Sequence, residues 1–227
     1  MDMVEKDWRI LCWRAKWLGK RGIIGASLPD YELYEADTED DYHVLYDLHP
    51  LLNEADVVVA HNAARFDVPK VNARMLAHRL RPPSPYRIVD TLRMARSHFS
   101  FYSYKLNDLA VALGLGKKLP TGGFGLWRAC LEGQPEAWAK MGRYCEQDVR
   151  LLEKVFLRLR PYVSRLPNPG TYTGEFCCSK CGSNDVQRRG YAHTNLTKFQ
   201  RYVCRKCGGW SRARVREGKS APLSGIV

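Results

Sequence analysis

Two short cysteine motifs near the C-terminus constrain the fold of this 227-residue chain more than any other feature. Cys178 and Cys181 form one Cys-x₂-Cys motif, Cys204 and Cys207 form a second, and 22 residues separate them. Four thiolates at this spacing suit tetrahedral structural zinc. The sequence therefore predicts a small domain organised by Zn²⁺, with no open coordination position for catalysis.

The residues around these motifs fit the same interpretation. Gly182 and Gly208 directly follow the two pairs and permit tight turns that point both sulfurs at one ion. Residues 185–189 and 200–203 alternate like short hairpin strands, and this arrangement resembles a zinc ribbon. Cys177 competes with Cys178 as a ligand, but the two-residue spacing favours Cys178.

The other cysteines and His193 are expected to be structural. Cys12, Cys130 and Cys145 are interpreted as small buried apolar residues, and His193 as a polar loop residue rather than a ligand. The N-terminus lacks the apolar core of a secretory signal, and no run approaches the roughly 18 apolar residues of a membrane span. We therefore expect a cytoplasmic protein with reduced thiols and no membrane partner.

The net charge of +12 is concentrated in the tail, where residues 166–227 hold 11 Lys and Arg against 3 Asp and Glu. Such a balance favours a polyanion partner, most simply nucleic acid. Tyr191 and Phe199 are interleaved and suit base stacking, whereas Tyr202 and Trp210 are expected to pack inside the small domain. The basic residues expected to contact nucleic acid are Arg188, Arg189, Lys198, Arg201, Arg212, Arg214 and Arg216.

The first 160 residues alternate strand and helix patterns, which indicates an α/β domain. A Gly/Pro-rich loop is expected over residues 117–125, and Pro135 starts a long helix. The expected strands are 8–17, 23–28, 56–60 and 86–89, and the expected helices are 42–54, 68–80, 105–113 and 136–159.

Two acidic motifs carry the chemistry of this domain. The segment from His61 to Asp67 directly follows an apolar strand, and ligand sites of α/β sheets gather at strand ends. Tyr144 and Asp148 are four residues apart and share one face of the long helix. A carboxylate this close to a core calls for a partner or a metal.

Together these motifs resemble the second and third motifs of DEDD-type 3′–5′ exonucleases, in the variant that carries a tyrosine. Residues 89–92 and 99–113 are also similar to segments that lie between them in that family. The resemblance implies an RNase H-like fold, with a mixed sheet flanked by helices, over residues 8–160. It further implies a hydrolase that uses two Mg²⁺ or Mn²⁺ ions.

By matching motif, the resemblance makes Asp67 and Asp148 ligands of these ions and Tyr144 the group that orients the attacking water. Asn62 and Phe66 would shape the site, and His61 would be structural. Asp90 would either assist at the site or cap the next helix; both interpretations stay open.

The family also needs an Asp-x-Glu pair on a first, central strand, and none occurs in a suitable place here. Without this central strand, the edges of the two strands beside it would be exposed. Asp2 and Glu5 lack the spacing of Asp-x-Glu, and Glu5 with Asp7 has that spacing in reversed order with no apolar strand before it, so these acids are disfavoured as substitutes. We expect an upstream strand lost by truncation, misassigned start or gene splitting, and little activity from this chain alone.

The nearest group is phage-type stand-alone exonucleases with a C-terminal zinc ribbon. It implies a nuclease domain over 1–162, a linker over 163–173, a zinc ribbon over 174–216 and a flexible tail over 217–227. The implied partners are 3′ ends of single-stranded DNA or RNA and a DNA polymerase or replication complex, in a bacterial or phage-infected cell. The alternative is a non-catalytic zinc-ribbon protein that binds nucleic acid and carries a remnant nuclease domain.

Overall fold

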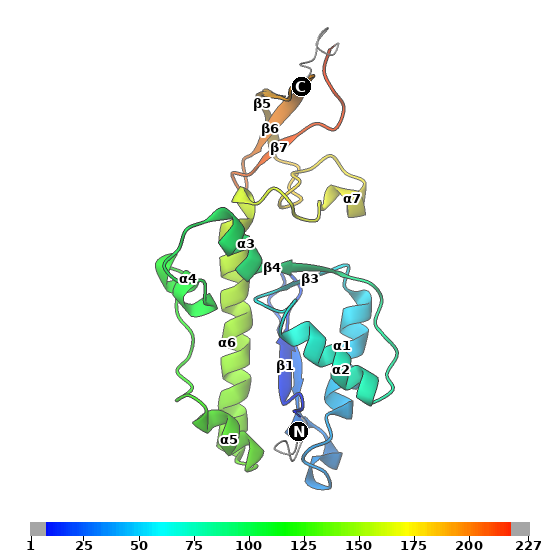
Figure 1. The fold of residues 1–227 in the computed structure, drawn as a ribbon, viewed down its shortest axis with the longest axis vertical. Coiled ribbons are helices and arrows are strands. Elements are labelled where there is room, and N and C mark those ends of the chain that lie inside the picture. Colours follow the sequence, from blue (N-terminus) through cyan, green and yellow to red (C-terminus); the bar gives the residue numbers. More distant parts are fainter. Residues whose placement is uncertain (1–7, 219–227) are drawn as a thin grey trace, which may run out of the picture. The chain divides into compact units, whose positions relative to one another are not determined.

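A computed structural model describes residues 8–218, and the chain divides into two compact units, Met1–Phe156 and Leu157–Val227 (Figure 1). Asp2, Glu5 and Asp7 lie outside the described residues, as does the predicted flexible tail beyond Gly218. None of the helices between residues 8 and 218 is long and apolar enough to cross a membrane.

The first unit is a mixed α/β fold built on two small sheets. Strand β1 (Cys12–Ala15) pairs antiparallel with β2 (Ile24–Ser27), and β3 (Val57–Ala60) pairs parallel with β4 (Arg87–Asp90). Within residues 8–218 no strand pairing joins the two sheets. Each of β1 and β3 therefore keeps one edge without a partner strand in this part of the chain.

Strand β1 is much shorter than the strand expected over residues 8–17. Its four residues are half-buried, and the chain then turns, with Lys20 N donating to Trp17 O (2.9 Å) and Gly19 at a φ of 79°. The prediction failed here because Trp17, the aromatic residue beyond Ala15, belongs to this turn and is exposed.

Helices surround the sheets at nearly the predicted positions. The sequence pattern identified α1 with its observed bounds, and Pro135 begins α6 as expected. Helix α5 was missed because it is only seven residues long and buries just Leu126 and Cys130, too few for a periodic pattern. The helices are α1 (Tyr42–Glu54), α2 (Asp67–Ala77), α3 (Thr91–His98), α4 (Leu106–Ala112), α5 (Gly125–Leu131) and α6 (Pro135–Leu159).

One buried cluster joins α1, α5 and the first half of α6. Trp138 packs edge-on against Tyr34, with ring centroids 6.1 Å apart. Removal of this apolar surface from water is the main force that holds α5 and α6 against the sheet. The buried members are Leu28, Val44, Leu126, Cys130, Ala137, Trp138 and Met141.

Contacts along α6 fasten it to the β1–β2 hairpin. Lys16 Nζ lies 2.5 Å from a Glu153 carboxylate oxygen, and the other oxygen accepts from Gly19 N (3.1 Å). Further along, the thiols of Cys12 and Cys145 are 3.5 Å apart and half-buried, whereas Cys130 is fully buried as predicted. These contacts fix the turn of α6 that carries the Tyr144 and Asp148 motif.

A fully buried carboxylate, not anticipated from the sequence, holds α1, α2 and the segment before β1 together. Asp41 accepts hydrogen bonds from Arg74 Nη2 (2.7 Å), His78 Nε2 (2.5 Å) and Ile10 N (2.7 Å). Burial alone would raise the pKa of Asp41, but these donors outweigh it and lower that pKa. Asp40, Asp41 and His78 resemble a metal-ligand set, yet the guanidinium of Arg74 already neutralises Asp41.

The second unit contains a short helix, α7 (Gly170–Thr173), within the predicted linker, and an antiparallel sheet of order β5-β6-β7. Strands β5 (Val186–His193) and β6 (Lys198–Cys204) extend the predicted hairpin, and β7 (Trp210–Arg212) adds a third strand. Glu217 still bridges to Lys198, at the start of the predicted tail. His193 lies in β5, so its interpretation as a loop residue is wrong.

We predict that Asp41→Ala lowers the free energy of unfolding by about 1.5–3 kcal/mol, because it removes the buried acceptor to which Arg74, His78 and Ile10 donate. Asp56→Ala, at an exposed aspartate, should change it by less than about 0.5 kcal/mol. Because the folded-state pKa of Asp41 is lowered, its contribution should persist above the unfolded pKa and disappear as pH falls through the folded pKa. Urea unfolding across this pH range measures both effects; equal losses in the two variants would contradict the assignment.

Candidate functional site

The turn after β3 brings Asp67 to the start of α2. Asn62 adopts a left-handed conformation with φ of 66°, which Asn tolerates better than most residues. Its carbonyl accepts from Phe66 N (3.1 Å), and this closes a compact turn. The His-Asn segment thus makes the chain reverse directly from strand into helix.

Asp90 fixes this turn from the neighbouring strand. Its buried Oδ1 accepts from Asn62 N (2.9 Å), and also from Leu92 N (2.9 Å) and Arg93 N (3.4 Å) at the start of α3. Of the two roles left open for Asp90, the structure gives it the helix cap. The same carboxylate also ties the ends of the parallel strands β3 and β4 together.

His61 belongs to the framework of the turn. Its Nδ1 lies 2.9 Å from Thr91 Oγ1, and that hydroxyl donates to Ala60 O (3.1 Å). Since the hydroxyl proton is used, Nδ1 must be the donor. Burial lowers the pKa of His61, so the ring is neutral at neutral pH.

Asp67 carries a charge that its surroundings disfavour. Asp67 as a whole is exposed, but partial burial of its carboxylate raises its pKa and the negative charge of Asp90 adds to the rise, against the opposing effects of its own backbone N–H and of Lys70. Lys70 instead sits over the exposed ring of Phe66, with Nζ 3.5 Å from the ring centroid. A cation beside Asp67 would stabilise the charged form of its carboxylate, as is typical of functional carboxylates.

Helix α6 presents Tyr144 and Asp148 one turn apart, and a lysine joins them. Lys118 Nζ lies 2.5 Å from Asp148 Oδ2 and 3.3 Å from the Tyr144 hydroxyl. Burial lowers the pKa of Lys118, but the bond to Asp148 outweighs it and the pKa is raised. Burial and the charge of Asp148 raise the pKa of Tyr144, so its hydroxyl keeps its proton at neutral pH.

Lys118 is a residue that sequence reasoning missed. It lies in the Gly/Pro-rich loop and is held there because its backbone N–H donates to Asn107 Oδ1 (2.9 Å). The only signal in the sequence was the Lys117-Lys118 pair before Pro120, and such pairs are common on surfaces. Only the fold brings this loop beside Asp148, 30 residues away.

Asp148 retains coordinating capacity. Its Oδ1 is buried and has no hydrogen-bond partner among residues 8–218. Carboxylate oxygens are hard donors of the kind that Mg²⁺ and Mn²⁺ prefer. The chemistry of Asp67 and Asp148 therefore fits a divalent metal, although the structure does not show the two carboxylates in contact.

In addition to the larger lowering by burial, the charge of Asp90 raises the pKa of His61 and the charge of Lys118 lowers it. The missing acidic pair is not supplied by other Asp-x-Glu spacings. Asp30 accepts from Ser27 N (2.7 Å) in a 3₁₀ turn, and Asp37 accepts from Glu39 N (2.8 Å) in a loop. Neither pair lies on a strand within the described residues.

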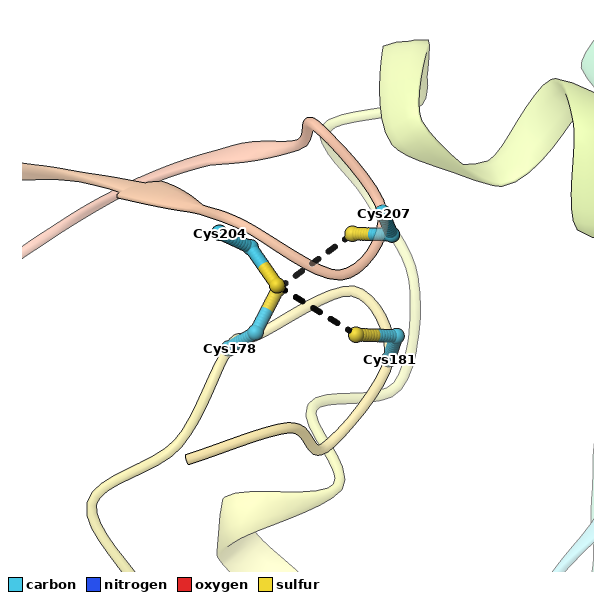
Figure 2. Close-up of side chains that lie close together, drawn as sticks. All are labelled: Cys178, Cys181, Cys204 and Cys207. Carbon is cyan, nitrogen blue, oxygen red and sulfur yellow. Dashed lines mark hydrogen bonds between the residues drawn. The ribbon is translucent and has the colours of Figure 1, made fainter. Parts of the chain in front are cut away.

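In the second unit the four predicted cysteines form one cluster (Figure 2). Their sulfurs lie within 4.8 Å of one another, with Cys178 to Cys207 and Cys181 to Cys204 both at 3.7 Å. A tetrahedral ion with Zn–S bonds of about 2.3 Å requires S···S separations of about 3.8 Å. The cluster can therefore bind zinc and is compatible with a zinc ribbon.

Backbone N–H groups prepare this cluster for a metal. Lys180 N donates to Cys178 Sγ and Gly209 N to Cys207 Sγ, both at 3.4 Å. Burial would raise the pKa of Cys204, but N–H donors bring it to about 7, whereas burial and the neighbouring thiols raise the pKa of Cys181 and Cys207. Cys177 is not among the clustered thiols, as the spacing predicted.

Of the seven basic residues predicted to contact nucleic acid, five lie on the sheet, and all seven are exposed. The expectation that Trp210 packs inside the small domain is wrong, since 46% of it is exposed and Arg201 lies over its ring. Tyr202 is half-buried, with its ring 5.2 Å from that of the exposed Phe176.

A family model described as RNase_H superfamily matches residues 25–160, more than half of the chain, and the chain belongs to this superfamily. Its members are typically nucleases, so a nuclease-type function is indicated, and such nucleases usually use divalent metals. No curated protein matches the sequence significantly.

We predict about one zinc ion per chain in protein purified under reducing conditions. Cys204→Ser should release the ion and unfold the second unit, because metal binding and folding are coupled. Cys177→Ser is the matched control, since this adjacent thiol lies outside the cluster, and it should retain full zinc content. Metal analysis measures the zinc content and circular dichroism measures folding. Wild-type protein that contains no zinc would exclude the zinc site.

Proposed function

We propose that this chain carries the framework of a metal-dependent 3′–5′ exonuclease that hydrolyses phosphodiester bonds of DNA or RNA. The observation that carries the proposal is Asp148, whose buried Oδ1 has no hydrogen-bond partner among the described residues and which has Tyr144 one turn earlier on α6. Further support comes from the superfamily membership and from Asp67, the first residue of α2 after the turn that follows β3.

In this proposal Asp67 and Asp148 hold divalent ions, Mg²⁺ or Mn²⁺. When bound, such ions activate water and stabilise the charge of the phosphoryl transition state. The Tyr144 hydroxyl, which keeps its proton, orients the attacking water. Lys118 neutralises Asp148 until an ion takes over that charge.

Two carboxylates are too few to hold two divalent ions tightly, so we propose that an Asp-x-Glu strand completes the site. The free edges of β1 and β3 suit such a strand, because it would join the two small sheets into one. On this account the 227-residue chain alone is weak or inactive.

The second unit would hold the substrate strand through its basic residues. We propose single-stranded 3′ ends as the partner, with a phage or bacterial replication complex and its polymerase as the setting. The positive charge of residues 166–227 supports this assignment.

The alternative is a non-catalytic protein that binds nucleic acid and carries a remnant nuclease domain. One observation favours it: Lys118 already pairs with Asp148, and an internal ammonium is a substitute for a lost metal. The two functions differ in whether a supplied acidic strand restores hydrolysis.

We predict that extending the chain with an N-terminal strand carrying Asp-x-Glu produces Mg²⁺- or Mn²⁺-dependent trimming of a 5′-labelled single strand. In this protein Asp148→Ala should abolish activity. Tyr144→Phe should reduce the rate about 10²-fold, as expected for a positioned catalytic group. Glu146→Ala, which removes only an exposed pair with Arg150 on the same helix, should retain activity.

Two results would contradict the proposal. Strong trimming by the 227-residue chain, lost on Asp67→Ala, would show that its own acids complete the site. A folded, zinc-loaded extended protein without metal-dependent activity would favour the binding function.

A further inference from the structure

The register of the C-terminal sheet defines two faces with different residues. Directly paired residues share a face, and residues alternate between faces along each strand. In the antiparallel register of β6 and β7, Arg201 lies opposite Arg212 and Val203 lies opposite Trp210. These four residues therefore lie on the same face as Phe199. We call these five residues the arginine–aromatic face.

On this face each arginine covers an aromatic ring of the adjacent strand. The guanidinium of Arg201 lies 4.6 Å from the Trp210 ring centroid, and that of Arg212 lies 4.5 Å from the Phe199 ring centroid. Arg201 is also anchored, because its Nε donates to Arg189 O (3.1 Å) at the bulge of β5. The two aromatic rings and the two guanidinium groups thus alternate across β6 and β7.

The charge of this face is uncompensated. Within residues 8–218 neither Arg201 nor Arg212 forms an ion pair with a carboxylate. Asp185, one of few acids in this unit, instead lies beside Arg205 at 3.9 Å. Exposed cations without acidic partners are available to phosphates.

We infer that the arginine–aromatic face binds single-stranded nucleic acid, with bases stacked on Trp210 and Phe199 and phosphates accepting from Arg201 and Arg212. A nucleic-acid base stacks on an aromatic ring more strongly than an exposed guanidinium does. A base can therefore replace the guanidinium on the ring, which leaves the arginine to bind a phosphate of the nucleic-acid backbone. Duplex bases are already stacked on each other, which makes a single strand the ligand. The inference deepens the proposed function by naming the face that holds its substrate.

The opposite face provides a matched control. Tyr191 pairs with Gln200, which alternates with Arg201, so its ring lies on the other side of the sheet. Like Trp210 it is exposed, at 40%, and a cation covers it, with Lys198 Nζ at 4.8 Å from the ring centroid. The two rings differ chiefly in the face that they occupy.

The test is fluorescence anisotropy with labelled 15-nucleotide dT and rU strands, in the Asp148→Ala background so that no hydrolysis contributes. Trp210→Ala should weaken binding about tenfold, the loss expected for one stacked base, and Trp210→Phe should retain most affinity. Tyr191, which the sequence alone grouped with Phe199 as a stacking residue, lies on the other face, so Tyr191→Ala should change affinity less than twofold. Zinc content of one per chain confirms that each variant is folded.

Binding of either the DNA or the RNA strand with this pattern supports the inference. Equal losses for Trp210→Ala and Tyr191→Ala, no binding to either strand, or tighter binding to a duplex would overturn it. If the protein proves to have no nuclease activity, this binding pattern is still expected, because cleavage plays no part in the measurement.

Discussion

The arrangement of the candidate site depends on one buried carboxylate oxygen. Asp90 Oδ1 accepts from the backbone of Asn62 and from two N–H groups at the start of α3. These bonds hold the ends of β3 and β4 in register and set the turn that delivers Asp67. They act together with the bond from Phe66 N to Asn62 O and with the bond from Thr91 Oγ1 to Ala60 O, which hold the left-handed Asn62 and the His61–Thr91 contact. A residue that caps a helix thus also positions the carboxylate proposed to bind metal.

Charge balance explains the rest of the site. Asp67 is held where burial raises its pKa, and Asp148 is neutralised by one internal ammonium while its second oxygen has no partner in the described residues. Groups selected for stability alone are normally satisfied. The site instead keeps a carboxylate oxygen that can still bind a ligand, which is characteristic of functional regions.

Sequence reasoning identified long periodic elements and local motifs well. Helix α1, the start of α6 and the four clustered cysteines follow from periodicity, proline placement and spacing. It could not find Lys118 or Asp41, because Asp148 lies 30 residues from Lys118, Arg74 lies 33 residues from Asp41, and no local pattern marks these pairs. Short helix α5 lacked periodicity, and Trp210 was misplaced because an aromatic residue fits a core and a binding surface equally well.

The most direct test of the account is whether Asp67 and Asp148 bind the same divalent ion. Mn²⁺ added to the ¹⁵N-labelled chain at substoichiometric amounts should broaden the amide signals of both residues together. Lys118→Met should strengthen this broadening, because it removes the competing ammonium from Asp148. Broadening at only one of the two carboxylates, or none in the folded chain, would contradict a shared metal site.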